Sequence, residues 1–287
     1  MKIEKIHYFI IVFLLLNIFT WWVIFDFFIF SKHSFGSVSF LSVGQGDASL
    51  IKLPAGNILI DAGPNNSVID ALNRELPFYD RVIDLFILSH PSKDHYTGFF
   101  DILERHKVRM VMLNNPYYSL SSYQKLISEL KKKNILFIKG EKGVKVKWDN
   151  NQNALLVVYP QKMEKFEKDP NRFSLILNLD LGKNSFIFTG DIGSKEEEKI
   201  SPFLTSLVRF PAVLKVAHHG SKYSSSQRFL EALQPIIAVI PVGENSYGHP
   251  HQEVLERLKK VGADIFRTDL DGIIRFKIDK LGNLKRF

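Results

Sequence analysis

The sequence contains no cysteine among its 287 residues. This absence excludes disulfide bonds and every metal site built on thiolate ligands. Any metal site must therefore use histidine and carboxylate side chains, and a chain without cysteine suits reducing and oxidising compartments equally. Hydrophobic residues make up 45% of the chain, which is enough for the core of one large domain or two small ones.

Long hydrophobic runs are also scarce, and one of them is long enough to cross a bilayer. Residues 8–25, YFIIVFLLLNIFTWWVIF, are almost wholly apolar, and about 20 such residues span the hydrocarbon core. We therefore predict an N-terminal membrane anchor over residues 1–32, with a cleaved signal peptide as the alternative. Lys2 and Lys5 favour an N-terminus inside the cell. Residues 33–287 would then form an extracellular domain of a single-pass membrane protein.

The excess of positive charge lies outside the predicted anchor. Lysine and arginine number 38 against 30 aspartates and glutamates, a formal net charge of +8, and the charges within residues 1–30 cancel. A basic domain beside a membrane favours a polyanionic partner such as nucleic acid, anionic lipid or a teichoic-type polymer. The alternative is that the charge only keeps the domain soluble.

The remainder of the chain alternates strand and helix patterns, without a linker that would divide it. Short apolar runs bounded by glycine, proline or polar residues predict strands; examples are RVIDLFILSH, SLILNLDLG, NSFIFTGD and AVLKVAHHG. Helical patterns lie between them, as in residues 121–133 and 251–261. Two strand-rich halves with helices predict an α/β fold in which two sheets pack face to face with helices outside, an αββα sandwich.

Candidate metal ligands follow directly after predicted strands. Loops at strand ends converge while the sheet holds them rigid, so these side chains are expected to lie close together. Imidazole and carboxylate ligands in combination suit Zn²⁺ or Mn²⁺. The candidates at these positions are His90, Asp94, His95, Asp191, His218 and His219.

Taken in order, these motifs resemble the metallo-β-lactamase superfamily, and within it the extracellular hydrolase domain of ComEC-type DNA-uptake proteins. The resemblance is carried by SVGQGDASLI, ILIDAG, LSHPSKDHYTG, SFIFTGD, VLKVAHHGSKYSSS and NSYGHPHQEVLERL, spread over nearly all of residues 36–278. It implies a metal-activated water that attacks a phosphodiester during competence. One hydrophobic segment cannot form the multi-span channel of a full competence protein, so we expect the hydrolase domain alone on a membrane tether.

The resemblance also implies a ligand set. The superfamily's H-x-H-x-D-H turn maps in order onto His90, Ser92, Asp94 and His95. The bridging aspartate maps onto Asp191. The last ligand histidine maps onto His219 or its neighbour His218, and we favour His219 because the first histidine still belongs to the strand.

Ser92 departs from the family pattern, because ComEC-type domains usually carry aspartate at that position and a neutral hydroxyl is a poor metal ligand. In addition, no histidine matches the superfamily's further ligand before the bridging aspartate. We therefore expect a second metal, on His90 and the bridging aspartate, to be weak or absent. The first metal should be well held by Asp94, His95, Asp191 and His219.

Four further residues are candidates for supporting roles. Lys222, in HHGSKYSSS, could help to cradle a phosphate at a helix N-terminus, although residues 224–226 would serve equally as a helix cap. The resemblance makes His249 and His251 candidates to protonate a leaving alkoxide, or simply to order their loop. Asp47 would support the ligands from behind.

Three functions fit these observations. The leading prediction is an extracellular metal-dependent phosphodiesterase, a nuclease acting on DNA. The first alternative is a hydrolase of cell-wall, teichoic-type phosphodiesters. The second is a catalytically impaired protein that keeps the fold and binds a polyanion, which is motivated by Ser92.

Overall fold

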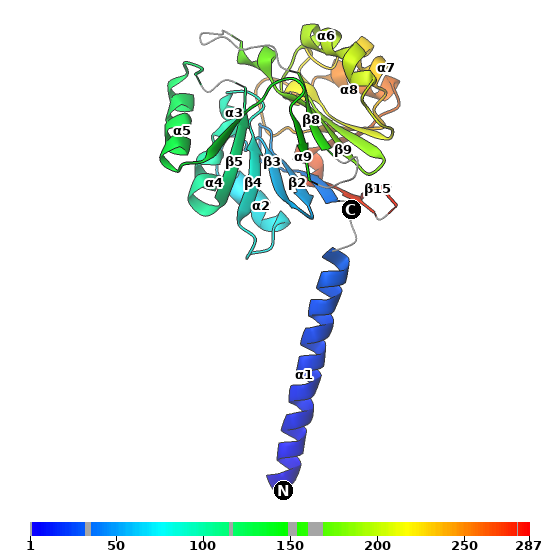
Figure 1. Ribbon diagram of the computed structural model, residues 1–287. Helices are drawn as coiled ribbons and strands as arrows, with labels where there is room; N and C mark the ends of the chain where they lie inside the picture. Colours follow the sequence, from blue (N-terminus) through cyan, green and yellow to red (C-terminus); the bar gives the residue numbers. More distant parts are fainter. Residues whose placement is uncertain (1, 32–35, 115–116, 149–153, 160–168, 280) are drawn as a thin grey trace.

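The computed structural model describes residues 2–31, 36–114, 117–148, 154–159, 169–279 and 281–287. An N-terminal helix, α1 (Lys2–Ser31), precedes a domain built on two β-sheets (Figure 1). The large apolar side chains of α1 between Tyr8 and Val23 are exposed. Across the described residues, no helix combines the length and apolar character needed to span a membrane. The predicted membrane-spanning anchor is therefore not confirmed.

The first sheet contains eight strands, among the described residues, in the order β15-β14-β1-β2-β3-β4-β5-β6. Strands β3 to β6 run parallel, and the others pair antiparallel. The bounds are β1 (Gly36–Phe40), β2 (Ser49–Leu53), β3 (Gly56–Ile60), β4 (Val82–Ile87), β5 (Lys107–Leu113), β6 (Leu136–Lys139), β14 (Ile274–Ile278) and β15 (Leu284–Arg286).

The second sheet contains seven described strands in the order β13-β12-β11-β10-β9-β8-β7. Strands β10 to β13 run parallel, and β7 to β10 pair antiparallel. The bounds are β7 (Lys145–Lys147), β8 (Ala154–Tyr159), β9 (Ile176–Leu181), β10 (Asn184–Phe188), β11 (Ala212–Lys215), β12 (Ile237–Ile240) and β13 (Asp264–Arg267).

The two sheets face each other across an apolar core. Val38, Phe40, Phe186 and Phe276 belong to this layer, where the rings of Phe40 and Phe276 meet edge to face with centroids 6.1 Å apart. Every residue of β10 is buried, because neighbouring strands flank it and other layers cover both of its faces. By contrast, β14 lies next to the edge strand β15, and its residues alternate between buried and more exposed positions.

Helices cover the outer faces of both sheets (Figure 1). The first sheet packs against α2, α4 and α5, and the second against α6, α7 and α8. The predicted αββα sandwich is therefore confirmed. The helix bounds are α2 (Ser67–Glu75), α3 (Lys93–Tyr96), α4 (Phe99–Arg105), α5 (Ser121–Lys132), α6 (Ser194–Thr205), α7 (Gln227–Leu233), α8 (Gln252–Lys260) and α9 (Thr268–Asp271), with 3-10 turns η1 (Pro170–Phe173) and η2 (Ala217–Gly220).

The direction of the parallel strands determines where the polar side chains that follow them lie. Because β3 and β4 are parallel, as are β10, β11 and β12, the carboxyl ends of each set lie along one sheet edge. Asp61 directly follows β3, and α3 comes shortly after β4. Asp191 and His219 follow β10 and β11. The architecture thus brings distant segments together at strand ends.

Candidate metal centre

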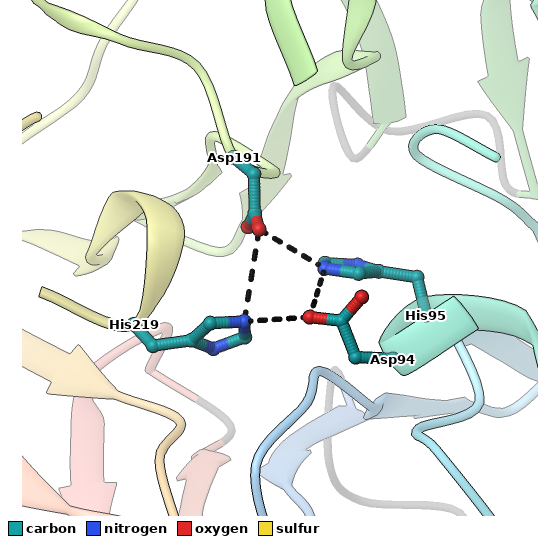
Figure 2. Close-up of side chains that lie close together, drawn as sticks. All are labelled: Asp94, His95, Asp191 and His219. Carbon is teal, nitrogen blue, oxygen red and sulfur yellow. Dashed lines mark hydrogen bonds and ion pairs between the residues drawn. The ribbon is translucent and has the colours of Figure 1, made fainter. Parts of the chain in front are cut away.

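Four predicted ligands meet where the ends of the two sheets face each other (Figure 2). Each offers a potential ligand atom, and these atoms all lie within 4.8 Å of one another. Three of the side chains are buried and the fourth, Asp94, remains 32% exposed. The four residues are Asp94, His95, Asp191 and His219.

The contacts within this group converge on the two imidazole Nε2 atoms. His95 Nε2 lies 3.3 Å from Asp191 Oδ2 and 3.7 Å from Asp94 Oδ2. His219 Nε2 lies 3.2 Å from Asp94 Oδ2 and 3.6 Å from Asp191 Oδ2. Two ring nitrogens and one oxygen of each carboxylate therefore face a common point, as ligands of a single cation must.

The backbone at the end of β11 selects which histidine joins the group. His218 and His219 both have positive φ angles, 53° and 54°, inside η2. Such angles cost a non-glycine residue about 1–3 kcal/mol and persist when surrounding contacts enforce them. His219 turns into the buried group, whereas the His218 ring lies 5.6 Å from the His249 ring along the groove. The favoured member of the predicted pair, His219, therefore joins the group, but His218 lies in η2 and not in the strand as predicted, because β11 ends at Lys215.

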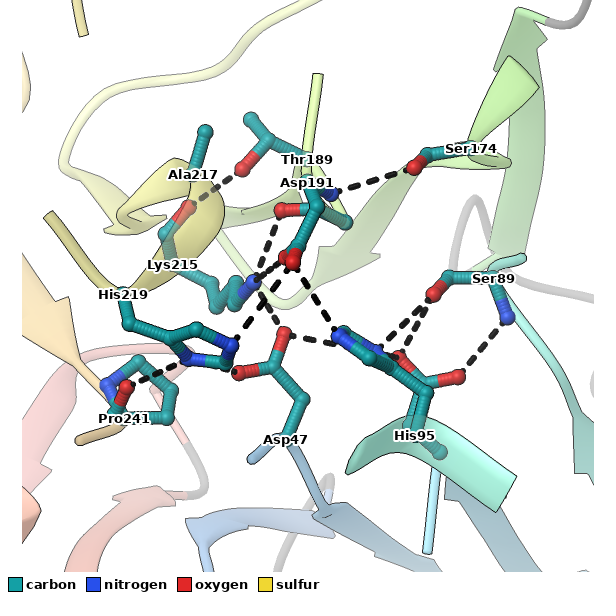
Figure 3. A network of polar contacts seen from close by, with 12 residues as sticks. Asp47, Ser89, His95, Ser174, Thr189, Asp191, Lys215, Ala217, His219 and Pro241 are labelled. Carbon is teal, nitrogen blue, oxygen red and sulfur yellow. Dashed lines mark hydrogen bonds and ion pairs between the residues drawn. The ribbon is translucent and has the colours of Figure 1, made fainter. Parts of the chain in front are cut away.

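The other nitrogen of each imidazole is held from behind (Figure 3). His219 Nδ1 lies 2.9 Å from the carbonyl oxygen of Pro241. A carbonyl only accepts, so Nδ1 carries the proton and Nε2 of the neutral ring keeps its lone pair. His95 Nδ1 lies 2.9 Å from Asp61 Oδ2. Such outer hydrogen bonds orient metal-binding histidines.

Asp61 was not among the predicted site residues. Its carboxylate accepts hydrogen bonds from the backbone N–H of Ser89 (2.8 Å) and from the Ser89 hydroxyl (2.7 Å), as well as facing His95. Burial raises the pKa of Asp61, and the facing imidazole of His95 opposes that rise. The sequence did contain an indication of this role: Asp61 directly follows the apolar run of β3, and a carboxylate at the end of a buried strand needs a partner.

The electrostatics of the four-residue group fit a divalent cation. Burial alone would raise the pKa of Asp191, but the imidazoles of His95 and His219 outweigh it and hold that pKa well below its usual range. Burial opposes protonation of His219, yet the facing carboxylates raise its pKa to about 10. The carboxylates of the group are therefore stabilised by a neighbouring positive charge. Without a metal, protonated imidazole rings supply that charge; a bound cation would replace those protons.

Unpartnered nitrogen atoms also fit a metal. The Nε2 atoms of His95 and His90 are buried and have no hydrogen-bond partner among the described residues. A buried polar atom without a partner costs ~1–3 kcal/mol. A cation held by the four-residue group would remove that cost for His95, whereas His90 lies outside the group. The donor set therefore matches Zn²⁺ or Mn²⁺, whose preferences include both imidazole and carboxylate.

A buried lysine, which sequence reasoning missed, stands behind the centre (Figure 3). Lys215 Nζ forms an ion pair with Asp47 Oδ2, lies 3.4 Å from Asp191 Oδ1, and donates to the Gly190 carbonyl at 2.8 Å. Burial lowers the pKa of Lys215, but Asp47 and Asp191 raise it above its ordinary value. The sequence indicated this role, because Lys215 is the last residue of the apolar strand β11 and a buried lysine is rarely found without a carboxylate partner.

Asp47 lies behind the ligands, as the sequence predicted. Its Oδ1 lies 3.3 Å from His219 Nδ1 and its Oδ2 lies 3.8 Å from His95 Nδ1. Burial alone would raise the pKa of Asp47, but the Lys215 ammonium outweighs it and lowers that pKa. Asp47 therefore connects the lysine to both imidazoles.

His90 and Ser92 do not complete a second ligand group among the described residues. His90 packs against His95 with ring centroids 4.2 Å apart, and burial, aided by the neighbouring His95, lowers its pKa to about 3. It is not part of the four-residue group. The Ser92 hydroxyl donates to Asp94 Oδ1 at 2.6 Å. Ser92 thus positions Asp94, a role that a hydroxyl can fill without binding a metal.

An open groove of about 540 Å³ lies over the four-residue group. Asp94, Asp191, His219 and His249 are among the residues that line it. Burial, followed by the nearby His218, lowers the pKa of His249 to about 4, so its ring is neutral at neutral pH.

The other predicted supporting residues lie outside this groove. His251 precedes α8, with its ring 5.3 Å from that of His249. Lys222 is exposed, and its Nζ lies over the Tyr223 ring, 5.3 Å from the centroid. Neither side chain is among those lining the groove. The predicted contact of Lys222 with a substrate in this groove is therefore not supported.

The serine run after Lys222 forms a helix cap. The Ser226 hydroxyl accepts a hydrogen bond from the Phe229 backbone N–H at 3.3 Å, at the start of α7. The backbone N–H groups of Ser225 and Ser226 donate to the buried carboxylate of Glu197. The donors that could have bound a phosphate are thus occupied by a side chain from α6, and the capping alternative describes this segment.

Comparisons with known proteins agree with this geometry. The family model described as "Metallo-beta-lactamase superfamily" matches residues 41–244. ComE operon protein 3 of Bacillus subtilis (strain 168) is 30% identical over 261 residues, covering 84% of this chain and 33% of that protein. Competence protein ComA of Neisseria gonorrhoeae is 27% identical over 252 residues, covering 86% of this chain and 33% of that protein. The chain spans about a third of the length of these curated relatives.

A solved structure shows the same architecture. The metallo-beta-lactamase fold protein YhfI from Bacillus subtilis superposes with a TM-score of 0.55 at 12% identity, covering 84% of this chain and 99% of that one. At this identity the likeness concerns the fold. Together with the family match and the convergence of His95, Asp191 and His219, it establishes that the chain belongs to the metallo-beta-lactamase superfamily.

Proposed function

We propose that this domain is a metal-dependent phosphodiesterase that hydrolyses DNA. The observation that carries the proposal is the clustering of Asp94, His95, Asp191 and His219 beneath a groove that three of them, Asp94, Asp191 and His219, line. The basic net charge of +8 favours a polyanion as the substrate. The similarity to competence proteins supports DNA as that polyanion.

One divalent cation, Zn²⁺ or Mn²⁺, would be held by the four clustered residues. A cation bound in such a site polarises a phosphoryl oxygen and lowers the pKa of a coordinated water. Asp61 and the Pro241 carbonyl hold the two imidazoles so that both Nε2 atoms face the cation position. Lys215 holds the second oxygen of Asp191, which keeps that carboxylate oriented.

A second cation would be weak or absent. His90 is the sole predicted ligand left for it besides Asp191, since the Ser92 hydroxyl is committed to Asp94. The ammonium of Lys215 already supplies positive charge to the Asp191 oxygen that faces away from His95 and His219. These contacts support a site with a single well-held cation.

His249 is proposed to contact the substrate from the groove wall. Its Nδ1 atom is buried and has no hydrogen-bond partner among the described residues. With a pKa of about 4 the ring is neutral, so it accepts a hydrogen bond or a proton rather than donating one as imidazolium. Donation to a leaving alkoxide, as predicted from the sequence, requires a phosphate beside the ring to raise that pKa.

The proposal is tested by incubating the purified full-length chain with labelled single-stranded DNA and Mn²⁺ or Zn²⁺. Wild type should cleave, and Asp191→Ala should lose at least ~100-fold in rate because the cation loses an oxygen ligand. Asp264→Ala, which alters an exposed aspartate on β13, is the matched control and should cleave normally. Absence of cleavage by wild type, or equal cleavage by Asp191→Ala, would reject the nuclease.

One observation favours a second candidate, a polyanion-binding protein without catalysis. Ser92 and the isolated His90 leave the second metal position incomplete in the described part of the chain. Metal content separates the two functions: DNA binding by a purified chain that takes up no divalent cation would favour the binding protein. The extracellular location stays a prediction.

A further inference from the structure

An exposed aromatic ring stands at the rim of the groove. The side chain of Tyr247 is 69% exposed and lines the same cavity as Asp94, Asp191 and His219. Its ring stacks on His249, with centroids 5.6 Å apart and planes inclined by 28°. One face of the tyrosine is thus supported by the groove wall, and the ring lies beside the candidate metal centre.

The loop that carries this ring is held in place by a single side chain. Asn245 Oδ1 accepts hydrogen bonds from the backbone N–H groups of Tyr247 (3.1 Å) and His249 (3.0 Å). Its Nδ2 donates to the carbonyl oxygens of Gly243 (2.8 Å) and His249 (2.9 Å). Gly248 allows the turn between the two rings, with a φ of +77°. The platform is therefore ordered before any ligand arrives, which reduces the entropy cost of binding.

The polymers considered for this site differ in whether they carry planar groups. Nucleic acids present a base at each phosphodiester, whereas teichoic-type chains of polyol phosphate present none. Stacking of a base on an aromatic side chain contributes ~1–3 kcal/mol and tolerates any base, because each base has a π-face. Bases in a duplex are already stacked, so only a single strand offers free faces to Tyr247.

We propose that Tyr247 is a stacking platform for a nucleobase of single-stranded nucleic acid, adjacent to the phosphodiester at the metal centre. This inference rests on the proposed function and names its substrate class more narrowly. The exposed Lys93, which lines the same groove, is placed to contact a phosphate of the bound strand. Base stacking and phosphate contact together would position the strand across the four-residue group.

Binding measurements test the platform separately from catalysis. The full-length chain is titrated in EDTA, which blocks cleavage, with fluorescent oligothymidylate and with an abasic oligomer of equal length and charge. Tyr247→Ala should weaken oligothymidylate binding about 5- to 150-fold, which corresponds to ~1–3 kcal/mol, and should change abasic binding less than ~2-fold. Tyr247→Phe should bind as wild type does.

Tyr79→Ala is the matched control, because Tyr79 is also 61% exposed but lies before β4, at the opposite end of the strand from His90. It should leave both affinities unchanged. Equal losses on both oligomers after Tyr247→Ala, or no loss on either, would overturn the platform. Wild-type binding of the abasic oligomer as tight as that of oligothymidylate would overturn it too.

The cleavage assay distinguishes the two proposals. If Tyr247→Ala selectively weakens oligothymidylate binding while wild type never cleaves DNA with added metal, the nuclease fails and the platform stands. If wild type cleaves DNA but the Tyr247→Ala affinities match those of wild type, the nuclease stands and the platform fails.

Discussion

Replacing Lys215 with methionine would remove a buried positive charge while keeping most of the side-chain volume. The Lys215 side chain is 3% exposed and contacts Asp47 and Asp191, whose side chains are 4% and 2% exposed. After the substitution, two buried carboxylates would lose their ammonium partner. The hydrogen bond from Nζ to the Gly190 carbonyl would also be lost.

The expected cost follows from this burial. Removing one partner of a buried ion pair costs ~3–5 kcal/mol, because the remaining charge is left unpaired in a poorly solvated site. One kcal/mol shifts the melting temperature of a domain of this size by about 2–4 °C. In EDTA, Lys215→Met should therefore melt roughly 6–20 °C below wild type in a calorimetric scan.

Added metal should reverse part of this loss. Without Lys215 the cluster around Asp191 is more negative, so a divalent cation is attracted more strongly and stabilises the folded state more. The rise in melting temperature on adding Mn²⁺ should consequently be larger for Lys215→Met than for wild type. A direct titration of Mn²⁺ should show the tighter binding.

The control is Lys132→Met, which removes a 67% exposed lysine paired with Glu129 at 2.7 Å. Exposed pairs contribute little, so its unfolding free energy should stay within ~0.5–1 kcal/mol of wild type. A Lys215→Met protein that melts in EDTA at the temperature of Lys132→Met would refute the assignment of Lys215 as the counter-charge. A smaller metal-induced rise than in wild type would refute the electrostatic part of the reasoning.

Three further predictions concern the surroundings of the centre. Asp61→Asn should weaken metal binding about 10- to 100-fold in isothermal titration, because the carboxylate that orients His95 through Nδ1 becomes a neutral amide; unchanged affinity would show that Asp61 is dispensable. Gly46→Ala should lower the unfolding free energy by ~1–3 kcal/mol or more in urea, since its Cβ would overlap the backbone carbonyl oxygen of Asp94; a neutral effect would mean that this contact relaxes easily. The lowered pKa of His249, about 4 against an ordinary 6.5, means that the fold favours the neutral ring, so its stabilisation is present above pH 6.5 and is lost as the pH falls toward 4. Between pH 7 and 5 the unfolding free energy of His249→Gln should therefore fall by about 1 kcal/mol less than that of wild type, after allowance for solvent screening of the half-buried ring. Equal decreases in the two proteins would contradict this.

Much of the architecture could be predicted from local patterns. Strand and helix periodicity, and the turn residues between them, depend on neighbouring side chains and were sufficient to predict the αββα sandwich. The absence of cysteine limited any metal site to imidazole and carboxylate ligands. The ends of β4 and β10 could be predicted from the sequence, and they placed Asp94, His95 and Asp191 among the candidate ligands.

Other features depended on contacts between segments distant in sequence. The sequence favoured His219 over His218 for a reason that the structure corrects: His218 lies in η2 rather than in β11, and two consecutive positive φ angles in η2 accompany the separation of the two rings. From the sequence, the serines before α7 could either bind phosphate or cap the helix. In the structure the carboxylate of Glu197, from α6, accepts hydrogen bonds from their backbone N–H groups, so these donors are not free for a phosphate. Lys222 belongs to a motif beside the site, but its side chain lies over Tyr223.

The sequence by itself determined the kinds of ligand, their order and the layers that carry them, because these depend on composition and on spacing along one chain. Only the tertiary structure decided that Lys215 pairs with Asp47 and Asp191 and that Asp61 orients His95. Burial makes an unpaired charge costly, so each of these groups must have a partner, but which partner it has is decided by how the two sheets pack.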